Sequence, residues 1–249
     1  MTDAFKDHFS SRSVDYSLYR PTYPPALAQE LARRAPGREL ALDCGCGSGQ
    51  FTPLLAEVFD RVEATDASEK QIAAAAPHPR ITYRVAKAEA SGLPDASVDL
   101  LTVAQALHWF DLDAFYAEAR RVLKPGGVVA LITYGDAELD GAIGDVLNTF
   151  SHRTIGRFWP PERRLVMEAY RSLPFPFEEE PVIETTMTAD WPLERLLGYV
   201  DTWSAMRGAE RELGRGPYEV FTRELGELWG DPAAPREVRW KLTARVGRA

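Results

Sequence analysis

A glycine-rich turn between a short apolar run and an amphipathic segment constrains the fold of this chain more than any other feature. The apolar run covers residues 40–42, the turn reads DCGCGSG at residues 43–49, and apolar side chains recur at helical spacing over residues 51–58. Glycine adopts positive φ angles without strain and lets a ligand approach the backbone closely. A helix that starts behind such a turn presents unpaired N–H groups to that ligand. The pattern therefore predicts a strand, a ligand-binding turn and a helix.

The same alternation of strand and helix repeats along the first half of the chain. Further strands are predicted at residues 62–65, 81–85, 98–103 and 128–133, and helices at about 25–35 and 111–123. Five strands that alternate with helices predict a parallel sheet covered by helices on both faces. After Tyr134, residues 136–175 are predicted mainly as helix and loop, 182–188 as a strand, 192–206 and 217–229 as helices, and 238–246 as a terminal strand.

Asp66 ends the second predicted strand, about 20 residues after the first glycine of the turn. A carboxylate at this position accepts hydrogen bonds from the ribose hydroxyls of an adenosine lying across the strand ends. The turn has Gly-x-Gly-x-Gly spacing, whereas a dinucleotide fingerprint needs Gly-x-Gly-x-x-Gly/Ala, and residue 50 is Gln. The turn also lacks the Gly-Lys-Ser/Thr ending of a P-loop. The pattern favours a nucleoside ligand without a pyrophosphate.

The composition and net charge of the chain limit the classes of binding partner that can be expected. The formal net charge is −8 and the isoelectric point is about 5.2, which disfavours binding to nucleic acid, where a basic surface is expected. No run approaches the roughly 18 apolar residues that span a bilayer, and the first residues resemble no secretory signal. Cys44 and Cys46 supply neither a disulfide framework nor a zinc site. We expect a cytoplasmic protein with a small-molecule partner, no metal and no membrane contact.

Four segments of the chain together resemble the class I S-adenosylmethionine-dependent methyltransferases. They are Leu42–Gly49, Thr65–Ser68, Leu93–Asp99 and Arg121–Gly127, in the order of that family. Two more segments, Tyr16–Pro24 and Ala104–Phe110, are similar to one branch, the type 11 methyltransferases related to trans-aconitate methyltransferase. The resemblance implies S-adenosylmethionine as cofactor and a small-molecule acceptor, such as the carboxylate of an organic acid.

The resemblance also implies a Rossmann-like, seven-stranded, mostly parallel sheet with an antiparallel last strand. We expect a single domain over residues 1–249. It would comprise an N-terminal arm and helix (1–36), a cofactor-binding core (37–135), a helical insertion with substrate-side elements (136–235), and a terminal strand (236–249).

Cofactor-binding roles follow from the same resemblance. The methionine part of the cofactor would be bound by Asp43, Gly45, Cys46, Gly47 and Gly49, the adenosine by Asp66, Ala67, Ala88 and Glu89, and the sulfonium end by Gln105 and Ala106. Tyr16 and Arg20 would close over the site, with Arg20 pairing the methionine carboxylate. Many relatives carry Asp where this chain has Lys87. Because Lys cannot accept the hydrogen bond of the adenine amino group, Glu89 or a backbone carbonyl would replace it.

Sequence motifs say less about the residues that would bind the methyl acceptor than about those that would bind the cofactor. His108 follows the fourth predicted strand, and we consider it both as a catalytic base and as a residue that only lines the site. The insertion also contains a cluster of basic and aromatic residues. This cluster either recognises an anionic acceptor or is simply the solvated face of a helix. Its members are His152, Arg153, Arg157, Phe158, Trp159, Arg163 and Arg164. Two other functions stay open, a nicotinamide-dependent Rossmann oxidoreductase, which the glycine spacing disfavours, and a non-catalytic nucleoside-binding module.

Overall fold

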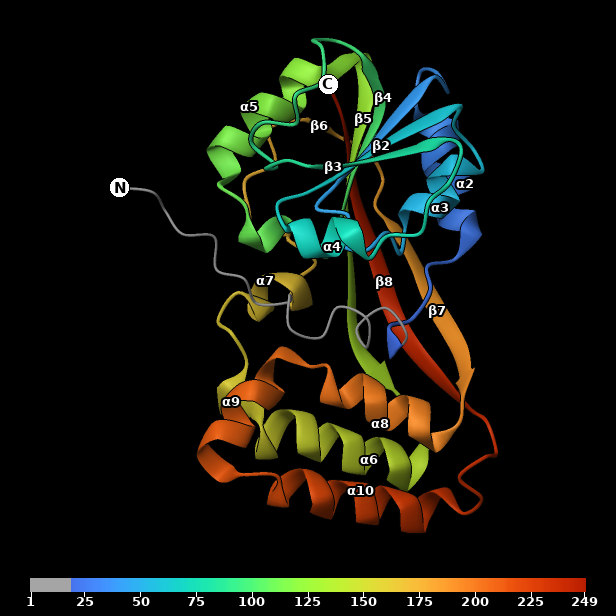
Figure 1. Cartoon of the computed structure of the whole chain (residues 1–249), viewed down its shortest axis with the longest axis vertical. Helices are drawn as coiled ribbons and strands as arrows, with labels where there is room; N and C mark the ends of the chain where they lie inside the picture. The colour runs from blue at the N-terminus through green and yellow to red at the C-terminus, as the bar shows by residue number, and fades with distance from the viewer. Residues whose placement is uncertain (1–18) are drawn as a thin grey trace.

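A central sheet organises the part of the chain that the computed structural model describes, residues 19–249 (Figure 1). Its strands are β1 (Leu40–Cys44), β2 (Arg61–Asp66), β3 (Ile81–Val85), β4 (Val98–Ala104), β5 (Leu123–Glu138), β6 (Glu178–Glu179), β7 (Ile183–Trp191) and β8 (Arg236–Arg248). The order is β3-β2-β1-β4-β5-β8, with β6 and β7 both paired to the outer edge of β8. The sheet therefore has the seven predicted positions, and two segments share the outermost one.

Strand direction agrees with the expectation from the sequence. The pairs β1–β2, β2–β3, β1–β4 and β4–β5 are parallel, and β8 runs antiparallel to β5. Because β1 pairs with β2 on one side and β4 on the other, the chain reverses its winding at β1. The carboxyl ends of these strands are where open α/β sheets bind ligands.

The helices lie in two groups (Figure 1). The first group covers the parallel strands: α2 (Pro25–Arg34), α3 (Thr52–Ala56), α4 (Glu69–Ala73) and α5 (Leu112–Val122). The second group belongs to the insertion: α6 (Gly141–Thr149), α7 (Arg163–Met167), α8 (Leu193–Asp201), α9 (Ser204–Leu213) and α10 (Gly216–Trp229). Of the second group, α6, α8 and α10 lie side by side beyond the far ends of β5, β7 and β8 (Figure 1). Among residues 19–249, no helix has the length and apolar character needed to cross a membrane.

One helix expected over residues 192–206 is in fact two, α8 and α9. Thr202 Oγ1 donates to the carbonyl of Tyr199 at 2.6 Å, and Trp203 has an extended backbone with φ −65° and ψ 141°. The indole of Trp203 packs against Tyr199 and Trp159, with ring centroids 5.6 and 5.4 Å away. Helical periodicity alone did not show this break, because it depends on burying a side chain against a distant segment.

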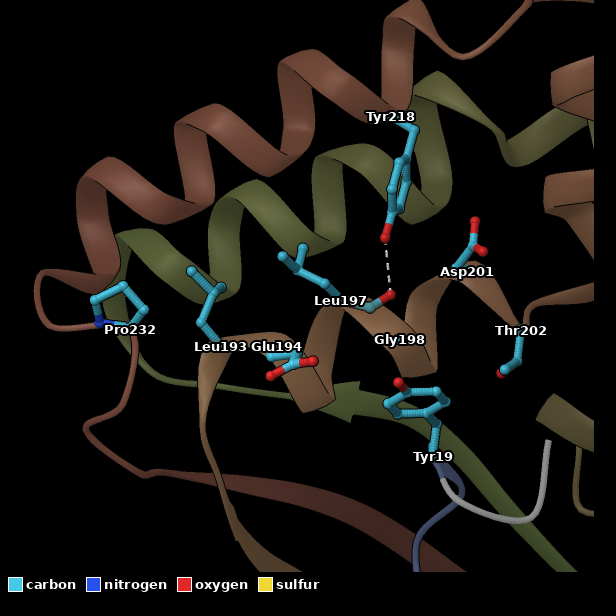
Figure 2. Close-up of a pocket in the computed structure, with 9 residues that line it drawn as sticks. All are labelled: Tyr19, Leu193, Glu194, Leu197, Gly198, Asp201, Thr202, Tyr218 and Pro232. Atoms are coloured by element: carbon cyan, nitrogen blue, oxygen red, sulfur yellow. Dashed lines mark hydrogen bonds between the residues drawn. The ribbon is translucent and has the colours of Figure 1, made fainter. Parts of the chain in front are cut away.

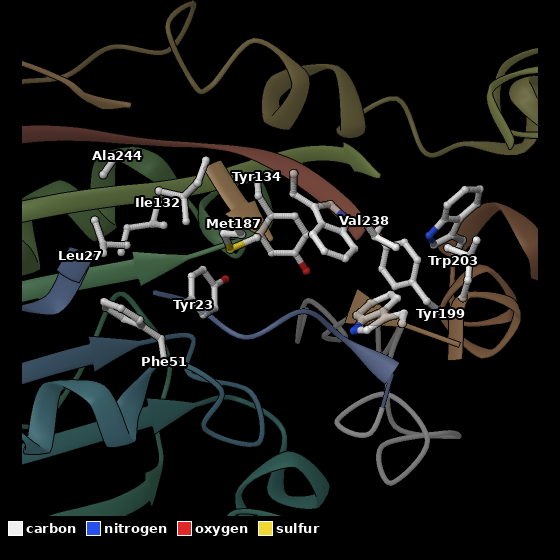
Figure 3. Close-up of a cluster of buried hydrophobic side chains, with 14 of the residues drawn as sticks. Tyr23, Leu27, Phe51, Ile132, Tyr134, Met187, Tyr199, Trp203, Val238 and Ala244 are labelled. Carbon is white, nitrogen blue, oxygen red and sulfur yellow. Dashed lines mark hydrogen bonds between the residues drawn. The ribbon is translucent and has the colours of Figure 1, made fainter. Parts of the chain in front are cut away.

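A continuous apolar core joins both groups of helices to the sheet (Figure 3). The ring of Tyr23 packs edge-on against Phe51 at 5.1 Å and against Tyr134 of β5 at 5.9 Å. Farther along the same core, Trp240 of β8 packs against Trp191 and Tyr199, and its Nε1 donates to the Tyr199 hydroxyl at 3.2 Å. The core thus connects the segment that leads into α2 with the strands that carry the insertion.

We predict that Trp240→Ala destabilises the protein by about 3–5 kcal/mol, because Trp240 is 0% exposed and its removal leaves a cavity and takes one hydrogen bond from the buried Tyr199 hydroxyl. Urea denaturation followed by circular dichroism measures the change. Leu228→Ala is the control, since Leu228 is 42% exposed and its truncation should cost less than about 0.5 kcal/mol. Equal losses in the two variants would contradict the central place of Trp240 in this core.

Candidate active site

A cavity of about 1010 Å³ lies where β1, β2 and β4 end. Its wall contains the predicted site residues Arg20, Asp43, Gly45, Cys46, Gly47, Asp66, Ala67, Ala88, Glu89, Gln105, Ala106 and His108. The fold therefore brings together residues that are spread over about ninety positions of the sequence. Two predicted residues are not among them: Tyr16 lies outside the described residues, and Gly49 does not line the cavity.

The glycine turn folds back onto the end of β2. The N–H groups of Gly45 and Cys46 donate to the carbonyl of Thr65 at 2.7 and 3.0 Å. Gly45 has φ +70°, and a Cβ there would lie 2.7 Å from the Cβ of Ala106. Only glycine therefore lets the turn pass this close to the residues that follow β4.

Gly49 serves packing rather than the cavity wall. Its φ is +87°, and a Cβ at this position would lie 2.6 Å from the hydroxyl oxygen of Tyr83 on β3. Gly49 is thus fixed by the side chain of Tyr83, and its predicted contact with the cofactor stays a prediction.

Asp66 is held in place by the two motifs that the sequence analysis singled out. One carboxylate oxygen accepts the N–H of Gly47 at 2.9 Å, and the other accepts the N–H of Ser68 at 2.8 Å. Burial raises the pKa of Asp66, while the two backbone hydrogen bonds lower it. The carboxylate thus lies in a fixed orientation at the cavity wall, with lone pairs left for a ligand's hydroxyl groups.

Asp43 is almost completely buried, at 1% exposure. Its carboxylate accepts hydrogen bonds from the hydroxyl groups of Thr52 at 2.6 Å and Thr102 at 3.0 Å. Burial raises the pKa of Asp43 to about 6, and the nearby charge of Asp66 adds to this effect. These bonds connect β1 with α3 and β4, so the carboxylate also fastens the floor of the cavity.

Gln105 gives the end of β4 an unusual shape. It is not glycine, yet its φ is +58°, and such conformations persist where the surrounding structure enforces them, often at functional sites. Its backbone N–H donates to Ile132 and its side-chain Nε2 donates to the carbonyl of Tyr134, both at 2.9 Å. These two bonds to β5 keep the strand end turned so that Gln105 and Ala106 line the cavity.

His108 has a partner that the sequence analysis missed. Its Nδ1 lies 2.8 Å from the hydroxyl of Tyr170, which is 0% exposed. Arg245 of β8 donates to the backbone carbonyls of Tyr170 and Leu173, both at 2.9 Å, and so holds this segment against the sheet. Tyr170 lies 62 residues beyond His108 in a segment without a recognisable motif, and no sequence signal pointed to it.

The contact with Tyr170 assigns a tautomer to His108. A buried phenol proton needs an acceptor, and Nδ1 of His108 is the one that lies against the Tyr170 hydroxyl. Nδ1 then accepts, and the imidazole proton sits on Nε2. Burial also lowers the pKa of His108 to about 4. A neutral imidazole with such a low pKa is a poor general base near pH 7.

The basic cluster of the insertion does not face the cavity. Arg157 pairs with Glu212, Arg163 with Asp136 and Arg164 with Glu168. The guanidinium of Arg163 also stacks over the Trp159 ring at 4.0 Å. Carboxylates of the same chain thus pair with three arginines of the cluster, and none of its residues lines the cavity, so recognition of an anionic acceptor by this cluster stays a prediction. The far part of the cavity wall is instead formed by Trp109, Phe110, Tyr134, Pro160, Pro161 and Glu162.

A second cavity, of about 480 Å³, lies among the insertion helices (Figure 2). It is lined by residues of α8 and α10 together with Tyr19, Thr202 and Pro232, and the Tyr218 hydroxyl donates to the carbonyl of Leu197 at 2.9 Å (Figure 2). None of the predicted site residues lines it. Of these two cavities, the larger one is therefore the one lined by predicted site residues.

Comparisons with known proteins indicate the family of this chain. The family model of the type 11 methyltransferase domain matches residues 42–131. A protein of Dictyostelium discoideum named as a methyltransferase is 35% identical over 206 residues, which is 80% of this chain and 78% of the relative. A Mycolicibacterium smegmatis protein named as an S-adenosylmethionine-dependent methyltransferase is 36% identical over 129 residues, 51% of this chain and 50% of the relative.

Solved structures extend the similarity over nearly the whole chain. A type II methyltransferase from Anaeromyxobacter dehalogenans is 48% identical, has a TM-score of 0.88, and the match covers 92% of this chain and 98% of that one. A phosphoethanolamine N-methyltransferase from Haemonchus contortus, solved with S-adenosylhomocysteine, shares the fold alone, with 17% identity, a TM-score of 0.51, and 99% and 60% of the two chains covered. The chain therefore belongs to the S-adenosylmethionine-dependent methyltransferase family.

Proposed function

We propose that this enzyme transfers a methyl group to a carboxylate of a small organic acid. The observation that carries the proposal is the state of His108, the titratable side chain that follows β4 at the cavity. It is hydrogen-bonded to Tyr170 and has a pKa of about 4, so it is a poor acceptor for a proton from a hydroxyl or ammonium group. A carboxylate is already a nucleophile at neutral pH and needs no base. The resemblance to the trans-aconitate methyltransferase branch supports the same class of acceptor.

The cavity residues fit the cofactor. The nearest atom to a Cβ built on Gly47 is Gln50 Oε1 at 3.6 Å, so a ligand can approach the backbone there. Asp66 presents a fixed carboxylate for ribose hydroxyls, Asp43 an anion for the methionine ammonium, and Arg20 a cation for its carboxylate. S-adenosylmethionine, when bound, supplies an activated methyl group.

The protein's own contribution is alignment and exclusion of water. Trp109, Phe110 and Tyr134 place aromatic surface along the cavity, and Pro160 and Pro161 add a rigid wall. The His108 Nε2–H would donate to an acceptor oxygen and orient it. Holding two reactants in near-attack geometry lowers a barrier by roughly 7–11 kcal/mol.

The acceptor is tested by incubating the enzyme with S-adenosylmethionine and a panel of organic acids that includes trans-aconitate. We expect S-adenosylhomocysteine and a methyl ester, both detected by mass spectrometry. Amine and hydroxyl analogues of the best acid serve as controls and should yield no methylated product. Methylation of the amine but not of the acid would refute the carboxylate proposal.

Two further outcomes address the alternatives. Thermal stabilisation by NAD but not by S-adenosylhomocysteine would favour an oxidoreductase. Tight binding of S-adenosylhomocysteine without turnover of any acceptor would favour a non-catalytic nucleoside-binding module.

Asp66→Ala should weaken binding of S-adenosylhomocysteine by about 1.5–3 kcal/mol, because charge-assisted hydrogen bonds to the ribose are lost. Isothermal titration calorimetry measures the affinity. Asp95→Ala is the matched control, since Asp95 is exposed, pairs with Arg121 and does not line the cavity. Unchanged affinity in Asp66→Ala would remove the ribose role.

His108 should remain neutral, as the Nε2–H tautomer, from pH 8 down to about pH 5. Two-bond ¹H–¹⁵N correlation spectra of the imidazole show the tautomer, and His108→Gln assigns its signals. An ordinary unfolded histidine takes up a proton near pH 6.5, whereas His108 does so near pH 4, so its contribution to stability is lost as the pH falls from about 6.5 to 4. A protonated His108 at pH 6.5 would contradict its neutral state and restore the catalytic base.

A further inference from the structure

Gln71 places a buried amide on the wall of the active-site cavity. The side chain is 5% exposed, and its Oε1 atom has no hydrogen-bond partner among the described residues. A buried carbonyl oxygen without a donor is costly, and native proteins rarely leave one unsatisfied. Because the residue borders a cavity built for a ligand, the missing donor is expected to come from that ligand.

Two hydrogen bonds place Gln71 next to the ribose-binding carboxylate. Asp66 accepts the N–H of Ser68 at 2.8 Å, and the Ser68 hydroxyl accepts the N–H of Gln71 at 3.4 Å. The helix that carries Gln71, α4, packs on β2 and β3, and the loop 86–89 that follows β3 lines the same cavity. Gln71 and this loop therefore flank the space beyond the ribose, where the base of an adenosine lies.

The polar side chains of the loop 86–89, Lys87 and Glu89, are both charged. Lys87 carries a side chain that only donates, and its backbone carbonyl accepts the N–H of Ala90 at 3.1 Å. Glu89 Oε1 accepts the N–H of Asp111 at 3.0 Å. Ala86 and Ala88 have no polar side chain. The amide oxygen of Gln71 is thus the neutral side-chain acceptor that this wall keeps available.

We propose that Gln71 Oε1 accepts a hydrogen bond from the exocyclic amino group of the cofactor's adenine and so selects a 6-aminopurine. Gln71 thereby supplies the acceptor that the side chain of Lys87, which only donates, does not provide. The proposal rests on S-adenosylmethionine being the cofactor, and it assigns a specificity-determining residue that the sequence motifs do not contain.

The test compares two ligands by isothermal titration calorimetry: S-adenosylhomocysteine and its analogue with hydrogen in place of the 6-amino group. The native protein should prefer S-adenosylhomocysteine by about 5- to 15-fold, the value of one hydrogen bond to a buried acceptor. Gln71→Met keeps the length of the side chain and removes the acceptor. This variant should weaken the binding of S-adenosylhomocysteine by a similar factor. Its affinity for the analogue should be unchanged or improved.

Two further variants separate recognition from packing. Gln71→Glu keeps an acceptor oxygen and should retain the preference for the 6-amino ligand. Gln50→Met is the matched control, because Gln50 lines the same cavity from the glycine-turn side, where its Nε2 donates to Ser48 at 3.1 Å. In that variant the ratio of the two affinities should stay at the native value.

The possible results are distinct. Equal weakening of both ligands in Gln71→Met indicates a packing role and overturns the proposal, as does a native protein that binds the two ligands equally. If the native protein binds neither ligand, the cofactor assignment fails together with the role of Gln71. Loss of preference in Gln71→Met with preference retained in Gln71→Glu supports the proposal.

Discussion

The antiparallel ladder between β5 and β8 is the constraint on which the rest of the molecule depends. It runs from the pair Val128–Arg248 to the pair Glu138–Arg239, and β7 continues it on the other edge of β8. One end of the ladder completes the sheet that ends in the glycine turn, and the other end carries the insertion helices (Figure 1). Because hydrogen-bonded strands set the register of everything attached to them, the ladder places Tyr134 at the cavity and anchors the segment of Tyr170 through Arg245.

The cavity is an acidic site whose carboxylates are held by neutral donors. Asp43 is bonded by two threonine hydroxyls, Asp66 by two backbone N–H groups and Glu89 by the N–H of Asp111. None of these contacts is a salt bridge, so the negative charges are oriented without being neutralised. Such preorganised groups recognise a ligand with little reorganisation when it binds.

Prediction from the sequence succeeded where the signal is local. Gly47 and Asp66 were assigned to one site because a glycine turn and a strand-end carboxylate at this separation have a known geometric relation, and the structure joins them by a hydrogen bond. It gave no sign of contacts that cross the chain. Gly49 packs on Tyr83 of β3, the insertion arginines pair with nearby carboxylates, and His108 is bonded to Tyr170. Motif spacing contains no information about such partners.

The amino-acid sequence by itself determined the alternation of strands and helices, the glycine turn and the class of ligand. These follow from apolar periodicity, from the conformational freedom of glycine and from the position of an acid at a strand end, which are all properties of neighbouring residues. Only the tertiary structure decided the contact of His108 with Tyr170 and the unsatisfied oxygen of Gln71. Both depend on burial and on which hydrogen-bonding groups come within reach, and those are set by packing between segments that are remote in sequence.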